Sequence, residues 1–198
     1  MPTSIGHALA GVAAAWAADV MPGRRAWRTA PPAAPWFQRA GNGLTLACAT
    51  LAVLPDADLL FHTHRSYSHS IGAVMAVALV AAGTAARRDR PIARVAAMCA
   101  AAYATHLLLD WLSVDVVQPR GIQALWPFTS QWYISEWNLF RQTERRGFLS
   151  LPTIWMNTQA ALQELLILAP ITAAIWLVRV KALARLATEL PGRDHPAE

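Results

Sequence analysis

The sequence has 198 residues, of which 55% are hydrophobic and only 15% are charged, and its mean hydropathy is +0.29. This composition is too apolar for an ordinary soluble domain and favours an integral membrane protein. The formal net charge of +5 does not indicate nucleic-acid binding, because the arginines form short clusters between apolar segments, as they do where they record membrane topology. Cys48 and Cys99 lack metal-ligand spacing and are expected to be buried spectators.

Apolar periodicity predicts an all-α, polytopic membrane bundle of about four to five transmembrane helices, in a single domain over residues 1–190. Ser4 is the expected N-cap of the first helix, which is short for a membrane span, and Pro22 and Gly23 end it. Its arginines follow the apolar stretch, which does not indicate a cleaved signal peptide. Pro55 breaks the second helix. In chain order the predicted helices cover residues 5–20, 44 to about 61, 70–86, 92–112 and 159–178.

The segments between these helices differ in kind. Residues 24–43 are a loop rich in arginine and proline, and residues 191–198 are expected to be a disordered tail. Residues 113–158 form a long polar to amphipathic excursion that carries five of the Trp and Tyr residues. Aromatic rings gather at the lipid headgroups. We therefore expect this excursion to lie on the extracytoplasmic membrane surface.

The basic residues indicate the orientation. Assigning the 17 Lys and Arg residues to alternate loops places twelve of them on one side of the membrane and five on the other. The positive-inside rule then puts the first group in the cytoplasm and the N-terminus outside.

Residues 54–70 concentrate the ionisable groups, since these seventeen residues contain two aspartates, three of the six histidines and an arginine. Membrane proteins keep ionisable groups at bilayer depth only where those groups are used. The predicted topology brings further acidic and histidine residues to the same outer face. The convergent set is His7, Asp56, Asp58, His62, His64, His69, His106, Asp110 and Glu164.

This set predicts a metal centre. His106 and Asp110 are spaced i, i+4, which places both side chains on one helix face, where they can hold one ion. Imidazoles and carboxylates without thiolates suit one or two divalent ions, with zinc first and manganese or iron as alternatives. Such an ion activates water and polarises a carbonyl or phosphoryl oxygen. The predicted ligands are His7, Asp58, His64, His69, His106 and Asp110.

Three further residues are assigned to catalysis. Asp56 or Glu164 would serve as general base, and Arg65 would contact an anionic substrate group, because its planar fork matches phosphate and carboxylate. Structural alternatives stay open at this stage, namely capping for Asp56 and His7 and a helix–helix hydrogen bond for Glu164.

The combination of these motifs resembles the YdjM-like family, described as inner-membrane-associated hydrolases that depend on a metal. The resemblance covers most of the chain and implies an inner-membrane protein with a metal site. Ser66 stands where the family commonly has Gly, and His62 is additional. The matching features are His7, the D-x-D pair Asp56 and Asp58, the run from His64 to Ser70, the H-x-x-x-D of His106 and Asp110, and L-W-P-F at Leu125 to Phe128 after Gly121.

The resulting functional hypothesis is a metal-dependent hydrolase of a bacterial-type inner (cytoplasmic) membrane, with its site on the extracytoplasmic face. It would act on a lipid or lipid-linked ester or phosphoester through metal-activated water. A metal-ion or proton transporter and a non-catalytic, metal-stabilised protein are the alternatives. Transport needs a second polar station toward the cytoplasm, where only Asp19 is available. The bilayer is the expected partner; no nucleic acid is expected, and the sequence identifies no protein partner.

Overall fold

The computed structural model describes residues 1–20, 41–61, 65–147 and 149–188, and within these ranges all regular structure is helical. The predicted all-α class is therefore confirmed. The predicted loop 24–43 and tail 191–198 lie largely or wholly outside the described residues. Five α-helices and two short 3-10 helices follow in order: α1 (Ser4–Val20), α3 (Gly43–Val53), η2 (Leu54–Phe61), η3 (Tyr67–His69), α4 (Ile71–Arg87), α5 (Ile92–Trp111) and α6 (Leu151–Thr188).

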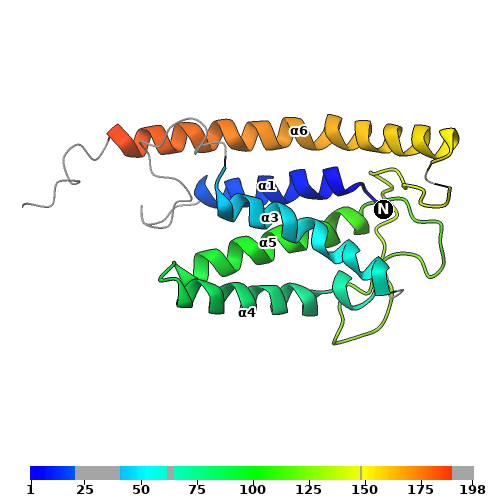
Figure 1. The fold of residues 1–198 in the computed structure, drawn as a ribbon, viewed down its shortest axis with the longest axis horizontal. Coiled ribbons are helices and arrows are strands. Elements are labelled where there is room, and N and C mark those ends of the chain that lie inside the picture. The colour runs from blue at the N-terminus through cyan, green and yellow to red at the C-terminus, as the bar shows by residue number, and fades with distance from the viewer. Residues whose placement is uncertain (21–40, 62–64, 148, 189–198) are drawn as a thin grey trace, which may run out of the picture.

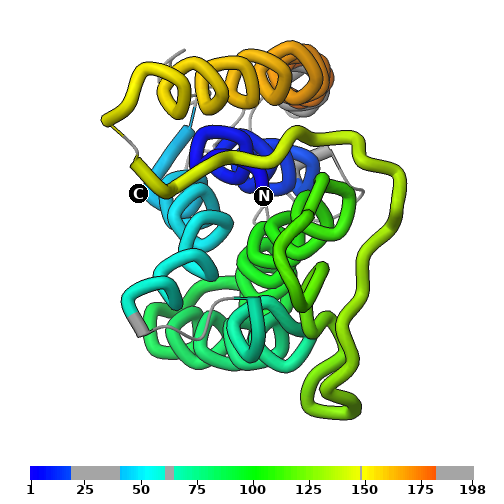
Figure 2. The backbone as a smooth tube through the Cα atoms, turned by 90° about the vertical axis from the view of Figure 1, so that its right-hand side faces the viewer, coloured from blue at the N-terminus to red at the C-terminus, as the bar shows by residue number. Residues whose placement is uncertain are grey.

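The α-helices lie side by side along the long axis of the molecule (Figure 1). Helix α6 forms one outer face, α1 lies beneath it, α3 and α5 come next, and α4 covers the opposite face (Figures 1 and 2). Helix α1 is central, since it packs against α3, α5 and α6, whereas α4 packs mainly on α5. The chain's N-terminus and the irregular segment after α5 lie at the same end, called here the N-terminal end of the bundle.

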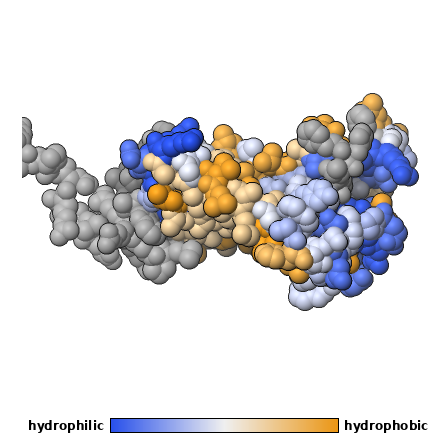
Figure 3. Space-filling view, turned by 90° about the horizontal axis from the view of Figure 1, so that it is seen from below, coloured by the Kyte–Doolittle hydropathy of each residue, from blue (hydrophilic) through white to orange (hydrophobic). Residues whose placement is uncertain are grey.

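Three helical segments are long and apolar enough to cross a membrane, namely Gly43–Leu60, Ile92–Trp111 and Leu151–Lys181, and α1 and α4 are shorter apolar helices. On the face seen in Figure 3, hydrophobic side chains cover the middle of the molecule, and hydrophilic ones gather toward its two ends. A hydrophobic band between polar ends is what a bilayer requires. The predicted membrane bundle thus consists of three helices of spanning length and two shorter ones.

Two helix ends at the N-terminal end of the bundle refine the sequence prediction. Thr3 rather than Ser4 caps α1, because its Oγ1 accepts the amide of Gly6 at 3.2 Å. The α-helix α3 stops at Val53 and continues only as the 3-10 helix η2. Pro55 has no amide hydrogen to donate, which explains why α-helical bonding ends there.

Helix α6 also begins earlier than predicted, at Leu151 rather than residue 159. The amide of Thr153 donates to Ser150 Oγ at 3.4 Å, and Pro152 lies in the first turn. A serine cap followed by proline is a typical helix start. The predicted excursion is correspondingly shorter. Its middle is irregular, with isolated bridges between Ser113 and Phe140 and between Ile122 and Tyr133.

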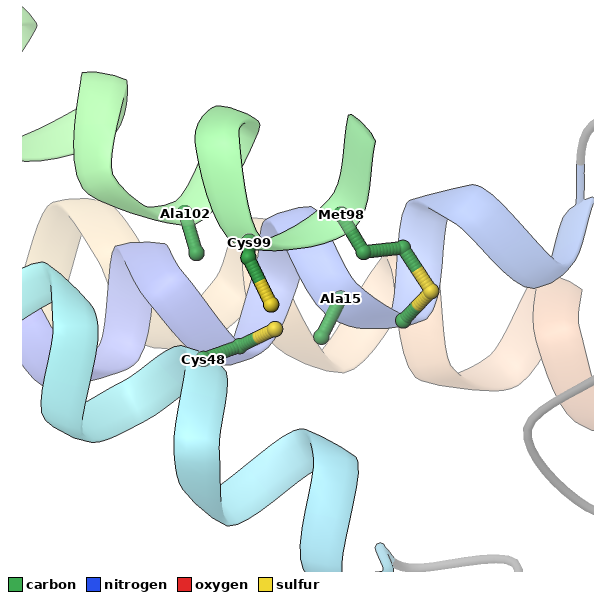
Figure 4. Packing of buried hydrophobic residues seen from close by; sticks show 5 residues of the cluster. All are labelled: Ala15, Cys48, Met98, Cys99 and Ala102. Carbon is green, nitrogen blue, oxygen red and sulfur yellow. The ribbon is translucent and has the colours of Figure 1, made fainter. Parts of the chain in front are cut away.

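The core between α1, α3 and α5 is made of small and sulfur-containing side chains. Ala15, Cys48 and Ala102 are fully buried, and the thiols of Cys48 and Cys99 point toward each other (Figure 4). Small residues allow close helix approach. A Cβ atom at Gly11 would lie 2.5 Å from Ala52 Cβ, so glycine is required where α1 meets α3.

Candidate metal centre

Five of the predicted residues meet at the N-terminal end of the bundle. Helix α1 supplies His7, η2 supplies Asp56, η3 supplies His69, and α5 supplies His106 and Asp110. The three histidines are fully buried and Asp110 is 3% exposed, whereas 13% of the Asp56 side chain is exposed. The cluster thus lies at the junction of four elements, with Asp56 nearest the surface.

The donor atoms of this cluster face a common centre. Two overlapping sets, His7–Asp56–His106 and His69–His106–Asp110, each have their ligand atoms within 4.8 Å of one another. Nε2 atoms of His69 and His106 lie 3.0 Å apart, and each lies 3.3 Å from Asp110 Oδ2 and 3.8 Å from Asp56 Oδ1. The ring of His7 stacks on that of His106 at 3.7 Å.

The other nitrogen of each central histidine is already committed. Nδ1 of His106 lies 2.7 Å from the carbonyl oxygen of Ala52. Nδ1 of His69 lies 3.1 Å from Asp58 Oδ2. A carbonyl and a carboxylate oxygen can only accept, so both Nδ1 atoms carry the hydrogen. In the neutral rings the two Nε2 lone pairs then face each other, which is the tautomer and orientation that metal-binding histidines require.

The spacing of the donor atoms in the cluster suits a divalent cation. Ligands about 2.1 Å from a zinc ion lie about 3.4 Å from one another in a tetrahedron, close to the separations found here. Buried polar atoms normally have hydrogen-bond partners. Within the described residues, neither ring nitrogen of His7 nor either carboxylate oxygen of Asp110 has one. A shared cation would satisfy these atoms together.

The family model of the YdjM inner membrane protein matches residues 1–185. The chain belongs to the YdjM family. No curated protein and no solved structure matches it significantly. The family and the helices of spanning length together show an inner-membrane protein. The resemblance found in the sequence is confirmed.

In this YdjM family member the two aspartates of the D-x-D pair take different positions. Asp58 lies outside the cluster, where its Oδ2 accepts from Arg65 N at 3.1 Å and from Ser68 Oγ, in addition to His69 Nδ1. Asp56 Oδ1 instead faces the Nε2 side of the histidines. Asp58 therefore contacts His69 on its Nδ1 side, and Asp56 lies on the Nε2 side of His69 and His106.

The remaining predicted site residues lie elsewhere. The guanidinium of Arg65 bonds to the carboxylate of Asp115, so its charge is used inside the protein. Glu164 accepts from the amide of Thr3 at 2.8 Å and from its hydroxyl, which fastens the start of α1 to α6. His64, like His62, lies outside the described residues.

Arg145, one of the basic residues that indicate the orientation, lies beside the cluster, with its Nη2 3.6 Å from Asp56 Oδ1. It lines a depression of about 470 Å³ together with Asp56, Ser4 and Leu54. Its side chain is 43% exposed. The depression is therefore the place where Asp56 can be reached from outside, with a cation at its edge. No spacing in the sequence pairs these two residues.

The electrostatics of the cluster favour a cation. Burial by itself would lower the pKa of His69, but the nearby carboxylates of Asp110, Asp56 and Asp58 more than offset it and hold that pKa well above the usual value. Three carboxylates around one ring leave an excess of negative charge. Either a proton or a metal ion can neutralise it.

Proposed function

We propose that this YdjM family member is a metal-dependent hydrolase that acts on a lipid or lipid-linked ester or phosphoester. The observation that carries the proposal is the 3.0 Å approach of His69 Nε2 and His106 Nε2, with both Nδ1 atoms held by acceptors. Two lone pairs at this distance repel unless a proton or a metal ion lies between them, and the buried atoms of His7 and Asp110 that lack hydrogen-bond partners favour a metal ion. Buried ionisable groups in a membrane protein are, in addition, typically functional.

His7, His69, His106 and Asp110 would hold one or two divalent ions, with zinc preferred for this nitrogen and oxygen donor set. When bound, such an ion lowers the pKa of water and polarises a carbonyl or phosphoryl oxygen. Asp58 keeps His69 in the required orientation through its Nδ1 hydrogen. The bond of His106 to Ala52 does the same from α3.

Asp56 is the carboxylate best placed to act as general base. Its Oδ1 is directed toward the histidine nitrogens, makes no hydrogen bond with the described residues, and borders the depression. It can therefore accept a proton from a water molecule that enters there. Glu164 is less suited, because both its oxygens are bonded to Thr3.

The depression supports a lipid substrate with a negative charge. Arg145 offers the cation, and the apolar side chains of Val53, Leu54 and Leu59 form the surrounding wall. Leu54 and Leu59 are exposed, and they end a segment of spanning length. A lipid in the outer leaflet would thus present its polar group to Asp56 and its chain to the leucines.

Elemental analysis of the purified protein in detergent tests the metal centre. We expect one or two zinc ions per chain, loss of the metal in His69→Ala and His106→Ala, and retention in the tail variant His195→Ala. Hydrolysis of phosphatidylglycerol and of a neutral lipid ester should disappear on chelation and return on adding metal.

Metal binding without hydrolysis by the restored protein would contradict the enzymatic proposal. If reconstituted vesicles then accumulate metal, the transport alternative replaces it. If His106→Ala abolishes the fold together with the metal, the ion has a structural role.

A further inference from the structure

A second, larger concavity lies away from the metal centre. It is an apolar groove of about 920 Å³, with walls from α3 and α4 and its floor from α5. Because α4 packs mainly on α5, the side chains of α3 and α4 do not close over it. Ala47, Leu51, Val77, Ala81 and Val95 are among the residues that line it. The groove runs within the hydrophobic band of the molecule, at the depth of lipid acyl chains.

One end of the groove is strongly basic. Arg88, Arg90 and Arg94, from the turn between α4 and α5 and the first turn of α5, all line it, and the amide-bearing Asn42 lies across from them at the start of α3. Asp89 lies between two of these arginines in sequence but does not line the groove. Three cations at the mouth of an apolar channel complement a molecule with an anionic head and a hydrocarbon tail.

We propose that this groove binds an anionic phospholipid, with its phosphate at the three arginines and an acyl chain between α3 and α4. The arginines lie on the side that the positive-inside rule assigns to the cytoplasm, where anionic headgroups attract basic residues. The site is separate from the metal centre, which lies at the opposite end of these helices. It does not depend on the hydrolase proposal.

Native mass spectrometry of the full chain, released from nanodiscs of equal phosphatidylglycerol and phosphatidylcholine, tests this proposal. We expect the wild type to retain phosphatidylglycerol about tenfold over phosphatidylcholine, given the attraction of several basic residues for an anionic headgroup. The triple variant Arg88→Gln, Arg90→Gln, Arg94→Gln should lose that preference. The matched triple variant Arg120→Gln, Arg141→Gln, Arg146→Gln, at the other end of the bundle, should keep it.

A second pair of variants tests the chain-binding part and leaves every arginine in place. Ala47 is exposed and lines the groove, so Ala47→Trp should fill it and abolish lipid retention. Ala97 is exposed on α5 outside the groove, and Ala97→Trp should retain the lipid. Helix content by circular dichroism confirms that each variant is folded.

Three outcomes would overturn the proposal. Equal retention of the two lipids by the wild type would show only a general lipid shell. Retention by folded Ala47→Trp would place the lipid elsewhere. A doubled mass in lipid-free detergent that Ala47→Trp alone removes would assign the groove to a second copy of the chain.

Discussion

Two aspartates separated by one residue perform different tasks in this protein. Asp56 faces the cluster, whereas Asp58 supports His69 from behind. Both aspartates belong to the 3-10 helix η2. The backbone of Arg65 is left-handed, with φ 68°, and its amide donates a hydrogen bond to Asp58. The backbone of Ser66 has φ −98°, so this position does not require the glycine that the family commonly has there. The position of a residue relative to a turn thus decides its role.

Replacing Asp58 separates an orienting residue from a ligand. In Asp58→Asn the amide oxygen can still accept from His69, but the charge that supports the ring is lost. We expect metal affinity to fall by about tenfold, the lower end for such outer residues, with unchanged stoichiometry in a chelator competition. Asp110→Asn should reduce the stoichiometry, and Asp89→Asn at the far end should change nothing. Complete metal loss in Asp58→Asn would make Asp58 a ligand.

His69 is also the residue at which we expect a proton and the proposed metal ion to compete. Its raised pKa means that the metal-free ring binds a proton at a pH where an ordinary histidine is neutral. Protonation therefore increases as the pH falls through this higher value, and the metal should be released beginning above about pH 6.5, the ordinary histidine value. Metal content after dialysis at stepped pH measures this. If the metal is released only at about pH 4, where carboxylates titrate, protonation of His69 is not the cause of the release.

The sequence predicted correctly which side chains meet where spacing dictates geometry, and their role as metal ligands stays a prediction. The i, i+4 pair His106 and Asp110 had to share a helix face, and alternate helix direction brought His7 and His69 to the same end. The partner of Arg65 is Asp115, 50 positions away in an irregular segment. Such a contact depends on loop conformation, which no periodicity encodes.

Among the helices, the close contact of α1 with α3 is expected to influence the candidate metal centre from a distance. In Gly11→Ala the added methyl would lie 2.5 Å from Ala52 Cβ and 2.7 Å from the Cys48 carbonyl oxygen. Helix α1 must then move from the residue whose carbonyl orients His106. We expect a loss of about 1–3 kcal/mol in the free energy of unfolding and weaker metal binding.

Gly83→Ala is the matched control for this substitution. A Cβ atom there meets nothing within 4 Å, so alanine should stabilise α4 by about 0.5–1 kcal/mol and leave the metal in place. Denaturant unfolding in mixed micelles gives both free energies. Equal responses of the two variants would show that the close approach of α1 and α3 has no influence on the site.

Element boundaries followed the sequence best where a strong signal existed. Pro55 correctly marked the end of α-helical structure, and Ser70, Oγ of which accepts from Ala73 N at 3.2 Å, caps α4. The start of α6 was missed because the aromatic residues before residue 159 suggested a surface segment. Ser150 followed by Pro152 is a typical helix start, and this local pattern is a better guide to the boundary than the aromatic composition of the segment.

At the scale of the whole molecule, the orientation in the membrane decides which side the candidate metal centre faces. Cys48 and Cys99 are buried, so a thiol reagent should react mainly with a cysteine introduced at the surface. Phe128→Cys in the exposed segment after α5 should react with an impermeant maleimide in intact spheroplasts, whereas Asp89→Cys should react only after permeabilisation. The reverse pattern would place the metal centre in the cytoplasm and invert the leaflet assigned to the groove.

The bond between Glu164 and Thr3 joins residues 161 positions apart, and this has a consequence for how the protein is made. His7 enters the membrane first, but the helix that fixes its position is synthesised last. Until α6 is inserted, all five donors of the cluster are present, but the start of α1, which carries His7, lacks the partner that fastens it. We therefore expect the candidate metal centre to reach its final geometry only after the last helix has been made.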